Sequence, residues 1–560
     1  MNRLFKQHDI RQVEDLEGLW EFGKLDDIED IPKYTHKMKV PGCWEESPDF
    51  YNYRGLAIYK KTFTLKEAKG ILLNFKGVSH TGKIYFDEEY LGEHYNAYTP
   101  FCFLKKNITA GEHEIKVIVD NRFSEESTLH VPNDYYTYGG ITRGISLEYV
   151  DEVYIRQLQF IPSFKDNRWH GEVSAIIHNY CNDTKKVHVS IEIADVRKAI
   201  DLQIEANTTK IITERVAFDH IQPWSMKTPH LYDLKAVIKK GDRILDDLIE
   251  RVGFRVIEVD GMDIKLNGEK VFIKGFNRHE DAANFGCSIP MNIMVKDIEL
   301  MKDMGANAVR TCHYPNDELF LDLCDEYGLL VWEENHARGL RIEKMLRPNF
   351  ESQCEECIEE MICNHYNHPS IFVWGILNEC ASHEPEGARM YQKQFNQIKS
   401  MDQSRPVTFA CDKHFKCLCL DMTDIVSLNV YYNWYHGYDV KEQMITEIDW
   451  VNDVTSHNRP VIISEFGGGA LYGYRNPNRA KWTEERQCDI LEECITKFSE
   501  IEQISGLFIW QFCDVRVTEE EWALRRPRTM NNKGIVDEYR RPKLAYHTVK
   551  RLWNNETVDK

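Results

Sequence analysis

Two glutamates occupy positions from which a pair of carboxylates could do chemistry. Glu379 follows closely after the apolar run 371–376, and Glu465 ends the apolar run 461–465. If both runs are strands of one barrel, the two side chains meet at the carboxyl ends of the strands and could lie about 5 Å apart. At that separation no water fits between them, so one carboxylate attacks a sugar directly while the other supplies a proton. Because the chain has 90 Asp and Glu residues, a solvated acid at each strand end is the alternative interpretation.

The segment after residue 260 has the pattern needed to hold these glutamates. Apolar runs alternate with amphipathic helical stretches, which is typical of parallel βα units. Eight runs are candidate strands: residues 271–275, 308–311, 329–333, 371–376, 407–410, 425–429, 461–465 and 506–512. Helices are expected between most of them, for example at residues 295–304, 350–364 and 484–498. We predict a (β/α)8 TIM barrel over residues 259–560, because no Gly-rich phosphate loop follows any strand as in a doubly wound open sheet.

Two β-rich domains are predicted ahead of the barrel. Residues 1–151 contain short alternating runs separated by turn-rich segments, which indicates a jelly-roll-like β-sandwich. Residues 152–258 continue with short strands over the length of an immunoglobulin-like β-sandwich. The predicted fold is therefore multidomain, β plus α/β. A chain of 560 residues is too long for one hydrophobic core, which agrees with this division.

The composition argues against several classes of function. The formal net charge is -20, which disfavours a broad basic surface for nucleic acid. With no apolar run of about 18 residues and no apolar signal-peptide core, we expect no membrane span and a cytoplasmic location. The sixteen cysteines are expected to be reduced thiols. Cys354 and Cys357 lack a second ligand pair at zinc-site spacing, so no metal site is predicted.

Several motifs along the chain resemble those of glycoside hydrolase family 2. They are residues 274–281 after the first strand, 305–315 around the second, 367–379 around the fourth and 463–467 at the seventh. The resemblance covers nearly the whole chain, including the order of sandwich, immunoglobulin-like domain and barrel. It implies that Glu379 is the acid/base, that Glu465 is the nucleophile of a retaining mechanism, and that no cofactor is required. Asn378 resembles the family residue that holds the 2-hydroxyl of the sugar.

Further residues near the strand ends are similar to the pocket wall of this family. Tyr431 and Tyr435 follow the sixth strand, where family members place a tyrosine against the nucleophile. His313, Asn429 and Trp510 are expected to complete the wall, and Trp510 could equally be barrel core. Family members are commonly tetramers, so we expect a homo-oligomer. Some relatives with short loops bind a flavin mononucleotide away from the catalytic centre, and nothing in this sequence predicts such a site.

The segment after the eighth strand indicates the sugar. Asn531 and Lys533 resemble the Asn-x-Lys signature of β-glucuronidases, whose side chains hold the C6 carboxylate of the sugar. Arg528 lies where such enzymes carry an arginine, and Asp134 matches a position where the first domain reaches over the barrel mouth. An anionic sugar needs fixed donors and local positive charge in a chain of opposite overall sign. A solvated basic loop is the alternative interpretation.

The resemblance therefore predicts a retaining exo-β-glucuronidase acting on glucuronide conjugates or glucuronate-terminated oligosaccharides. A β-galacturonidase could use the same Asn531 and Lys533, because the C4 epimer keeps the carboxylate, whereas a β-galactosidase would have no use for the lysine. A carbohydrate-binding protein on an inactive hydrolase scaffold is the non-enzymatic alternative, and the presence of both glutamates argues against it. The segment 335–350 is short where such glucuronidases often carry a long insertion, so we expect an open mouth that accepts bulky or oligosaccharide aglycones.

Overall fold

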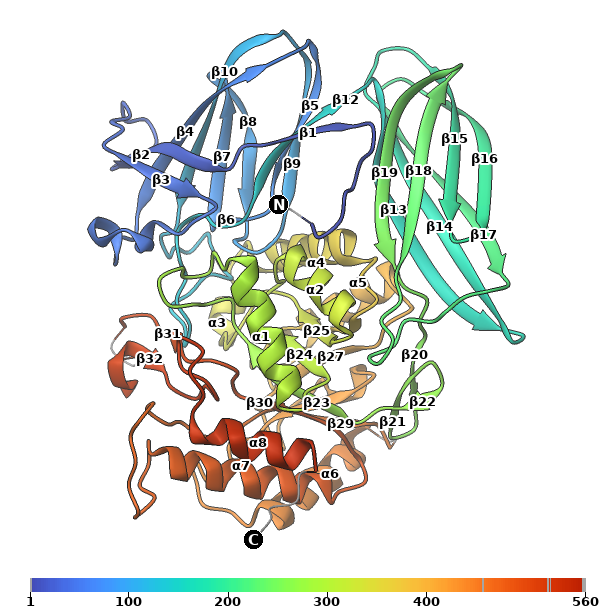
Figure 1. The fold of residues 1–560 in the computed structure, drawn as a ribbon. Helices are drawn as coiled ribbons and strands as arrows, with labels where there is room; N and C mark the ends of the chain where they lie inside the picture. The colour runs from blue at the N-terminus through green and yellow to red at the C-terminus, as the bar shows by residue number, and fades with distance from the viewer. Residues whose placement is uncertain (1–2, 456–457, 521–522, 524, 556–560) are drawn as a thin grey trace.

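The computed structural model describes residues 3–455, 458–520, 523 and 525–555, and it shows two β-sandwiches above a barrel (Figure 1). The first unit packs a six-stranded sheet, in the order β3-β2-β4-β10-β7-β8, on a four-stranded sheet, in the order β1-β12-β5-β9. Its strands are β1 (Gln12–Asp15), β2 (Gly18–Leu25), β3 (His36–Val40), β4 (Leu56–Leu65), β5 (Lys69–Phe75), β7 (Thr81–Phe86), β8 (Glu89–Tyr95), β9 (Phe101–Ile108), β10 (Gly111–Asp120) and β12 (Ile145–Val150). Trp20, Phe22 and Trp44 belong to its buried core. The predicted N-terminal sandwich is confirmed.

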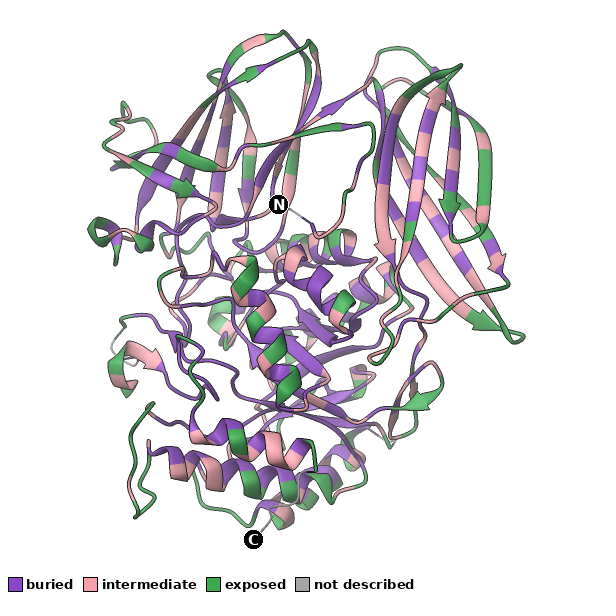
Figure 2. Ribbon diagram, viewed as in Figure 1, coloured by how far each residue is buried: buried purple, intermediate pink, exposed green. Residues whose placement is uncertain are grey.

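The second unit is an immunoglobulin-like sandwich of two sheets, as predicted. The sheets have the strand orders β13-β14-β17 and β16-β15-β18-β19. The strands are β13 (Val153–Lys165), β14 (Arg168–Asn179), β15 (Lys185–Ile193), β16 (Val196–Ile204), β17 (Thr208–Phe218), β18 (Tyr232–Lys240) and β19 (Arg243–Val252). Along β15, buried residues alternate with residues open to solvent, because one face packs on the facing sheet (Figure 2).

The third unit is a closed barrel of eight parallel strands, which confirms the predicted TIM barrel. The strands are β23 (Ile273–Arg278), β24 (Ala308–Thr311), β25 (Leu330–Glu334), β26 (Ile371–Ile376), β27 (Val407–Cys411), β28 (Val426–Asn429), β29 (Val461–Phe466) and β30 (Ile504–Ile509). The helices are α1 (Met291–Asp303), α2 (Glu318–Tyr327), α3 (Ile342–Met345), α4 (Phe350–His365), α5 (Pro385–Met401), α6 (Val440–Thr455), α7 (Glu484–Ser499) and α8 (Leu544–Trp553). The predicted eighth strand was too long, because Trp510 and Phe512 are buried in the loop that follows β30.

The first sandwich is docked on the end of the barrel where the parallel strands finish. Arg143 donates a hydrogen bond of 2.6 Å to Glu280, and the ring of Tyr98 stacks on Tyr314 with centroids 3.8 Å apart. Glu280 follows β23 and Tyr314 follows β24, so both contacts lie at the catalytic end of a barrel of this type. The segment between β10 and β12 thereby carries Asp134 to the barrel mouth.

The cysteines and the helices add two facts about the chain. All sixteen cysteines are free thiols, and both Cys354 and Cys357 are buried on α4. Within the described residues, the helices are too short or too polar to cross a membrane.

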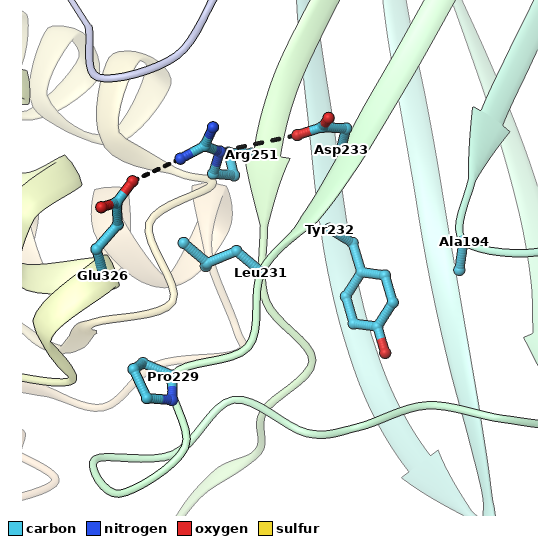
Figure 3. Close-up of a pocket in the computed structure, with 7 residues that line it drawn as sticks. All are labelled: Ala194, Pro229, Leu231, Tyr232, Asp233, Arg251 and Glu326. Atoms are coloured by element: carbon cyan, nitrogen blue, oxygen red, sulfur yellow. Dashed lines mark hydrogen bonds and ion pairs between the residues drawn. The ribbon is translucent and has the colours of Figure 1, made fainter.

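A cavity of about 590 Å³ lies where the immunoglobulin-like sandwich meets the barrel (Figure 3). Arg251 on β19 forms ion pairs with Asp233 on β18 (3.7 Å) and with Glu326 on α2 (2.6 Å). Glu326 lies near the end of α2, just before β25 begins, so this cavity is at the amino ends of the barrel strands. Barrel enzymes act at the opposite end, and we interpret the cavity as a polar junction between domains.

Candidate active site

The structure brings Glu379 and Glu465 to the carboxyl ends of two strands of one barrel. Glu379 follows β26 in a turn where its φ is 54° and its amide donates to the carbonyl of Ala410 at 3.0 Å. Its Oε1 accepts a hydrogen bond from Asn429 Nδ2 (2.9 Å), and its Oε2 lies 3.4 Å from a guanidinium nitrogen of Arg338. The side chain remains 15% exposed. Glu379 is therefore oriented by neighbouring strands while part of its carboxyl group faces solvent.

Glu465 is the more deeply placed of the two carboxylates, with 2% of its surface exposed. Its Oε1 accepts a hydrogen bond from Arg310 Nη1 (3.0 Å), and its Oε2 accepts one from the hydroxyl of Tyr431 (2.6 Å). Arg310 is fully buried and is held in place by two further bonds of 2.9 Å to Glu334. These donors fix the orientation of the Glu465 carboxylate and stabilise its charged form.

The pKa of Glu465 is raised to about 7. Burial is the largest cause, because it penalises the charged form, and the nearby charge of Glu379 adds to it. Arg310 and Tyr431 act in the opposite direction. Glu465 therefore takes up a proton as the pH falls through about 7.

Asn378 and His313 carry buried polar atoms that have no partner among the described residues. Asn378 Oδ1 accepts from Arg310 (2.8 Å), whereas its Nδ2 is unpaired. His313 Nδ1 lies 2.8 Å from a carboxylate oxygen of Glu334, whereas its Nε2 is unpaired and lies 3.9 Å from Glu465. Burial lowers the pKa of His313, so its ring is neutral. Unsatisfied buried groups beside a carboxylate pair indicate a polar ligand that completes their hydrogen bonds.

Asn429 and Trp510 hold other groups of the site in position. Asn429 donates to Glu379, and its Oδ1 accepts a bond of 2.7 Å from Ser464, the neighbour of Glu465. The ring of Trp510 stacks on His313, with centroids 5.1 Å apart and an interplanar angle of 15°. Both residues thus couple the ends of different strands, as expected for the wall of one pocket.

Lys533 is a buried cation without a carboxylate partner in the described part of the chain. Only 2% of its surface is exposed, and its Nζ donates to the hydroxyl of Tyr435 at 3.0 Å. The ammonium also lies over the rings of Tyr431 and Tyr435, at 5.1 and 5.3 Å from their centroids. Burial, aided by the charge of Arg526, lowers the pKa of Lys533. A buried charge is costly unless it is paired, so this arrangement indicates an anionic ligand.

Asp134 and Asn531 join an arginine beside Lys533. Arg526 Nε donates to Asp134 Oδ1 at 3.0 Å, and its Nη2 donates to the other carboxylate oxygen. Asn531 Nδ2 donates to that second oxygen at 3.1 Å. Polar groups of the first sandwich and of the loops after β30 therefore meet on one side of the mouth.

The structure does not bring Arg528 to this group. Its guanidinium pairs with Glu538, and its side chain is 48% exposed. The chain turns at Arg528, where φ is 64°, and this turn directs the side chain away from Asp134. Arg526 fills the expected place instead, because several arginines lie in the segment 525–528 and spacing alone does not choose among them.

Arg338 is a second residue that the sequence did not indicate. It follows β25, and its Nη1 donates to Asn133 Oδ1 at 3.0 Å while its Nη2 lies 3.4 Å from Glu379. The charges of Glu379 and Asp134 raise the pKa of Arg338 against the opposing effect of burial, which is the largest single contribution. Its position after the third strand was the only signal available, and no motif distinguishes it.

Two buried groups among the described residues place three metal-binding atoms within 4.8 Å of one another: His279, Cys312 and His313, and Asp322, Asp325 and His368. Protein contacts already occupy the second group, because Arg3 donates to Asp322 (2.8 Å) and His368 Nδ1 lies 2.5 Å from Asp325. In the first group, burial raises the pKa of the Cys312 thiol, which disfavours the thiolate that a metal needs. We assign no metal to either group.

A (β/α)8 barrel with a glutamate at the end of its fourth strand and another at the end of its seventh has the two carboxyl groups that a glycosidase uses. The whole length of the chain agrees with this class. Residues 257–557 match the TIM barrel domain of glycosyl hydrolases family 2, residues 153–255 match glycosyl hydrolases family 2, and residues 13–150 match its sugar binding domain. The protein belongs to glycoside hydrolase family 2 and is a glycosidase.

Similar proteins include uronidases of two kinds. The chain is 28% identical to a β-glucuronidase of Streptococcus agalactiae, over 97% of this chain and 96% of that protein. It is 45% identical to the solved structure of a β-galacturonidase from Eisenbergiella tayi bound to galacturonate, with a TM-score of 0.96 and 100% of both chains covered. A β-D-glucuronidase structure from Dictyoglomus thermophilum shares the fold, with 24% identity, a TM-score of 0.85, and 99% of this chain and 98% of that chain covered.

Proposed function

We propose that the protein is a retaining exo-β-uronidase that removes terminal β-D-galacturonate, with β-D-glucuronate as the second candidate sugar. The observation that supports a uronic acid as the substrate is the buried ammonium of Lys533, which lacks a carboxylate partner among the described residues. The higher identity to the Eisenbergiella tayi β-galacturonidase supports galacturonides ahead of glucuronides, which were the first choice from sequence. The two sugars differ only at C4, so each offers the same C6 carboxylate to Lys533.

The carboxylate pair performs a double displacement. Glu465 attacks the anomeric carbon while Glu379 protonates the glycosidic oxygen, so the aglycone leaves as an alcohol and the sugar becomes an ester of Glu465. Water then attacks the same carbon, its proton passes to Glu379, and the ester bond to Glu465 breaks. The pair regains its single proton, and the product keeps the β configuration. Every proton comes from the pair or from water, so the reaction requires no cofactor.

Hydrogen-bond donors around the site stabilise the nucleophile and bind hydroxyl groups of the sugar. Arg310 and Tyr431 stabilise the charged form of Glu465, which is the form that attacks the anomeric carbon. Nδ2 of Asn378, which has no partner among the described residues, donates to the 2-hydroxyl in this proposal, a contact that strengthens in the transition state. Nε2 of neutral His313 accepts from a second hydroxyl.

Closure of the pocket at its uronate end supports exo action. The ion pair between Arg526 and Asp134 joins the barrel to the first sandwich beside Lys533. This contact closes the wall of the pocket beside Lys533, and we expect that only the terminal residue of a chain is cleaved.

The test is kcat/KM for an aryl β-galacturonide, an aryl β-glucuronide and an aryl β-galactoside, with Glu465→Gln as the control. We expect both uronides to exceed the galactoside by about 10³-fold or more, because the neutral sugar leaves Lys533 unpaired. We expect the galacturonide to be the better uronide. A galactoside that equals the uronides would overturn the uronidase proposal, and a glucuronide that exceeds the galacturonide would reverse the order of the two candidates.

Two further predictions made from the sequence concern the intact protein, and the first of them follows from the family resemblance. A homo-oligomer, tetrameric by that resemblance, is tested by light scattering on the purified chain. A cytoplasmic location is tested by cell fractionation.

A further inference from the structure

We propose that a cavity of about 320 Å³ beside Glu379 is the aglycone subsite, and that it binds one neutral sugar unit rather than an aromatic group or a second uronic acid. This inference rests on the proposed uronidase function. Three loops line the cavity, and the lining residues are Gly339, Leu340, Arg341, Ile342, Glu343, Glu379, Ala381, His383, Glu384 and Lys413. Its size falls at the lower end of the range for small-molecule sites.

The position of the acid/base identifies what this cavity must hold. Glu379 protonates the glycosidic oxygen, so the leaving group lies on the side of the mouth that Glu379 faces. Lys413 connects the cavity to the acid/base directly, because its Nζ donates to the carbonyl oxygen of Glu379 at 3.2 Å. The uronate end of the site, at Lys533 and Tyr435, is built from the loops after β28 and β30 instead. The cavity and the uronate end are therefore formed by different strand ends.

The lining has the chemistry of a sugar site rather than of an aromatic one. Among the residues that line the cavity, the imidazole of His383 is the single ring, and no Phe, Tyr or Trp is present, so a flat apolar aglycone finds no large apolar ring on which to stack. Nδ1 of His383 is buried and has no hydrogen-bond partner among the described residues. A hydroxyl group can satisfy this nitrogen, whereas an apolar aglycone cannot.

The charges around the cavity favour a neutral unit over a second uronate. Lys413 is already paired with Asp412 at 2.7 Å, so it offers little free positive charge. Arg341 lies on the same rim as the carboxylates of Glu343 and Glu384. A second carboxylate would meet no surplus of positive charge here, in contrast to the unpaired ammonium at the uronate end. Hydroxyl groups, which both donate and accept, suit a rim of mixed charge.

The short connection after β25 leaves this cavity open. Between Glu334 and Phe350 the chain forms only the single helical turn α3, and both Arg341 and Glu343 are exposed. An open rim of this kind admits a sugar that continues into a longer chain. The sequence predicted an open mouth that accepts bulky aglycones, and we propose that the aglycone bound there is a neutral sugar unit.

The experiment compares three substrates on the full chain: an aryl β-uronide, a disaccharide of the same uronate on a neutral hexose, and the corresponding uronosyl-uronate. For each enzyme we take the ratio of kcat/KM on the neutral disaccharide to kcat/KM on the aryl uronide, because this ratio cancels changes in the chemistry of the first sugar. His383→Ala and Arg341→Ala should each lower the ratio by about 3- to 10-fold, the size of a lost hydrogen bond. The control Lys344→Ala changes an exposed cation on α3 that does not line the cavity, and its ratio should stay within about twofold.

Three outcomes separate the possibilities. An unchanged ratio in both cavity variants, confirmed as folded by thermal melting, overturns the subsite while leaving the uronidase intact. A wild-type protein that cleaves the uronosyl-uronate faster than the neutral disaccharide overturns the choice of a neutral sugar. A wild-type protein that cleaves none of the uronides overturns the proposed function, and the subsite with it.

Discussion

The two sides of the barrel mouth present different surfaces to a substrate. At the uronate end, Lys533, Asn531 and Asp134 are each at most 5% exposed. On the aglycone side, Arg341 and Glu343 are open to solvent. A buried polar group that loses its partner costs about 1–3 kcal/mol, whereas an exposed group exchanges its partner for water. The comparison teaches that this protein should select the terminal sugar sharply and the aglycone loosely.

The largest loss of activity should come from replacement of the proposed nucleophile, which lies between the uronate end and the aglycone side. Glu465→Gln should lower kcat by more than the roughly 10²–10⁴-fold that general acid–base help supplies, because no ester can form. Free galacturonate should still bind, since Lys533 is untouched, and calorimetry measures its Kd. Loss of binding together with activity would show that the uronate end depends on the nucleophile, and would break the separation between recognition and chemistry.

Removal of the buried cation Lys533 tests directly whether the uronate end selects the terminal sugar. Lys533→Met should lower kcat/KM for aryl uronides by about 10³-fold, because the sugar carboxylate is then buried without its partner. Turnover of the aryl β-galactoside, which has no carboxylate, should fall far less, and the ratio of the two substrates is the measurement. A parallel loss on both substrates would mean that Lys533 supports the fold rather than the recognition of a charge.

A comparison of two arginine variants tests which arginine supports binding at the uronate end. Arg526→Ala should lower kcat/KM for uronides by about 10- to 100-fold, because Asp134 is then left buried without its ion pair. Arg528→Ala removes a half-exposed side chain that pairs with Glu538, and it should change kcat/KM by less than about threefold. The reverse order of effects would favour Arg528, the arginine that the family resemblance suggested.

The pH dependence tests the charge of the nucleophile. Glu465 must be charged to attack the anomeric carbon, so kcat/KM should fall as the pH drops through about 7, where Glu465 takes up a proton. Tyr431 lowers the pKa of Glu465, so Tyr431→Phe should move this acidic limb to higher pH and lower kcat. Tyr432→Phe is the control, because the Tyr432 hydroxyl donates to Glu447 at 3.1 Å instead. A limb that stays in place in Tyr431→Phe would contradict this assignment.

The smallest effects should lie on the aglycone side. Replacement of one neutral hexose by another in the disaccharide substrate should change kcat/KM by less than about tenfold, because solvated groups discriminate weakly. A comparison of two or three uronosyl-hexoses measures this spread. A difference of 10³-fold would show that the aglycone is selected as sharply as the uronate, and the contrast between the two sides would disappear.

Burial explains why the barrel was visible in the sequence. All residues of β26 are buried, and fully buried parallel strands appear as continuous apolar runs, so this strand was predicted with the bounds that the structure shows. The same pattern gave a wrong end for β30, because the buried residues Trp510 and Phe512 extend the apolar run beyond the strand. An apolar run indicates that residues are buried, but it does not distinguish a strand from a buried loop that follows the strand.

The sequence by itself determined the residue types of the site and their order along the strands, because a strand end places the residue that follows it at a known edge of the barrel. On this basis the sequence predicts Glu379 and Glu465 as the carboxylate pair among 90 acidic residues. Only the tertiary structure decided that Arg526 rather than Arg528 reaches Asp134, since a left-handed turn sets the direction of each side chain. It also decided that Lys533 is buried without a carboxylate partner among the described residues, because that depends on groups from distant segments packing around one ammonium.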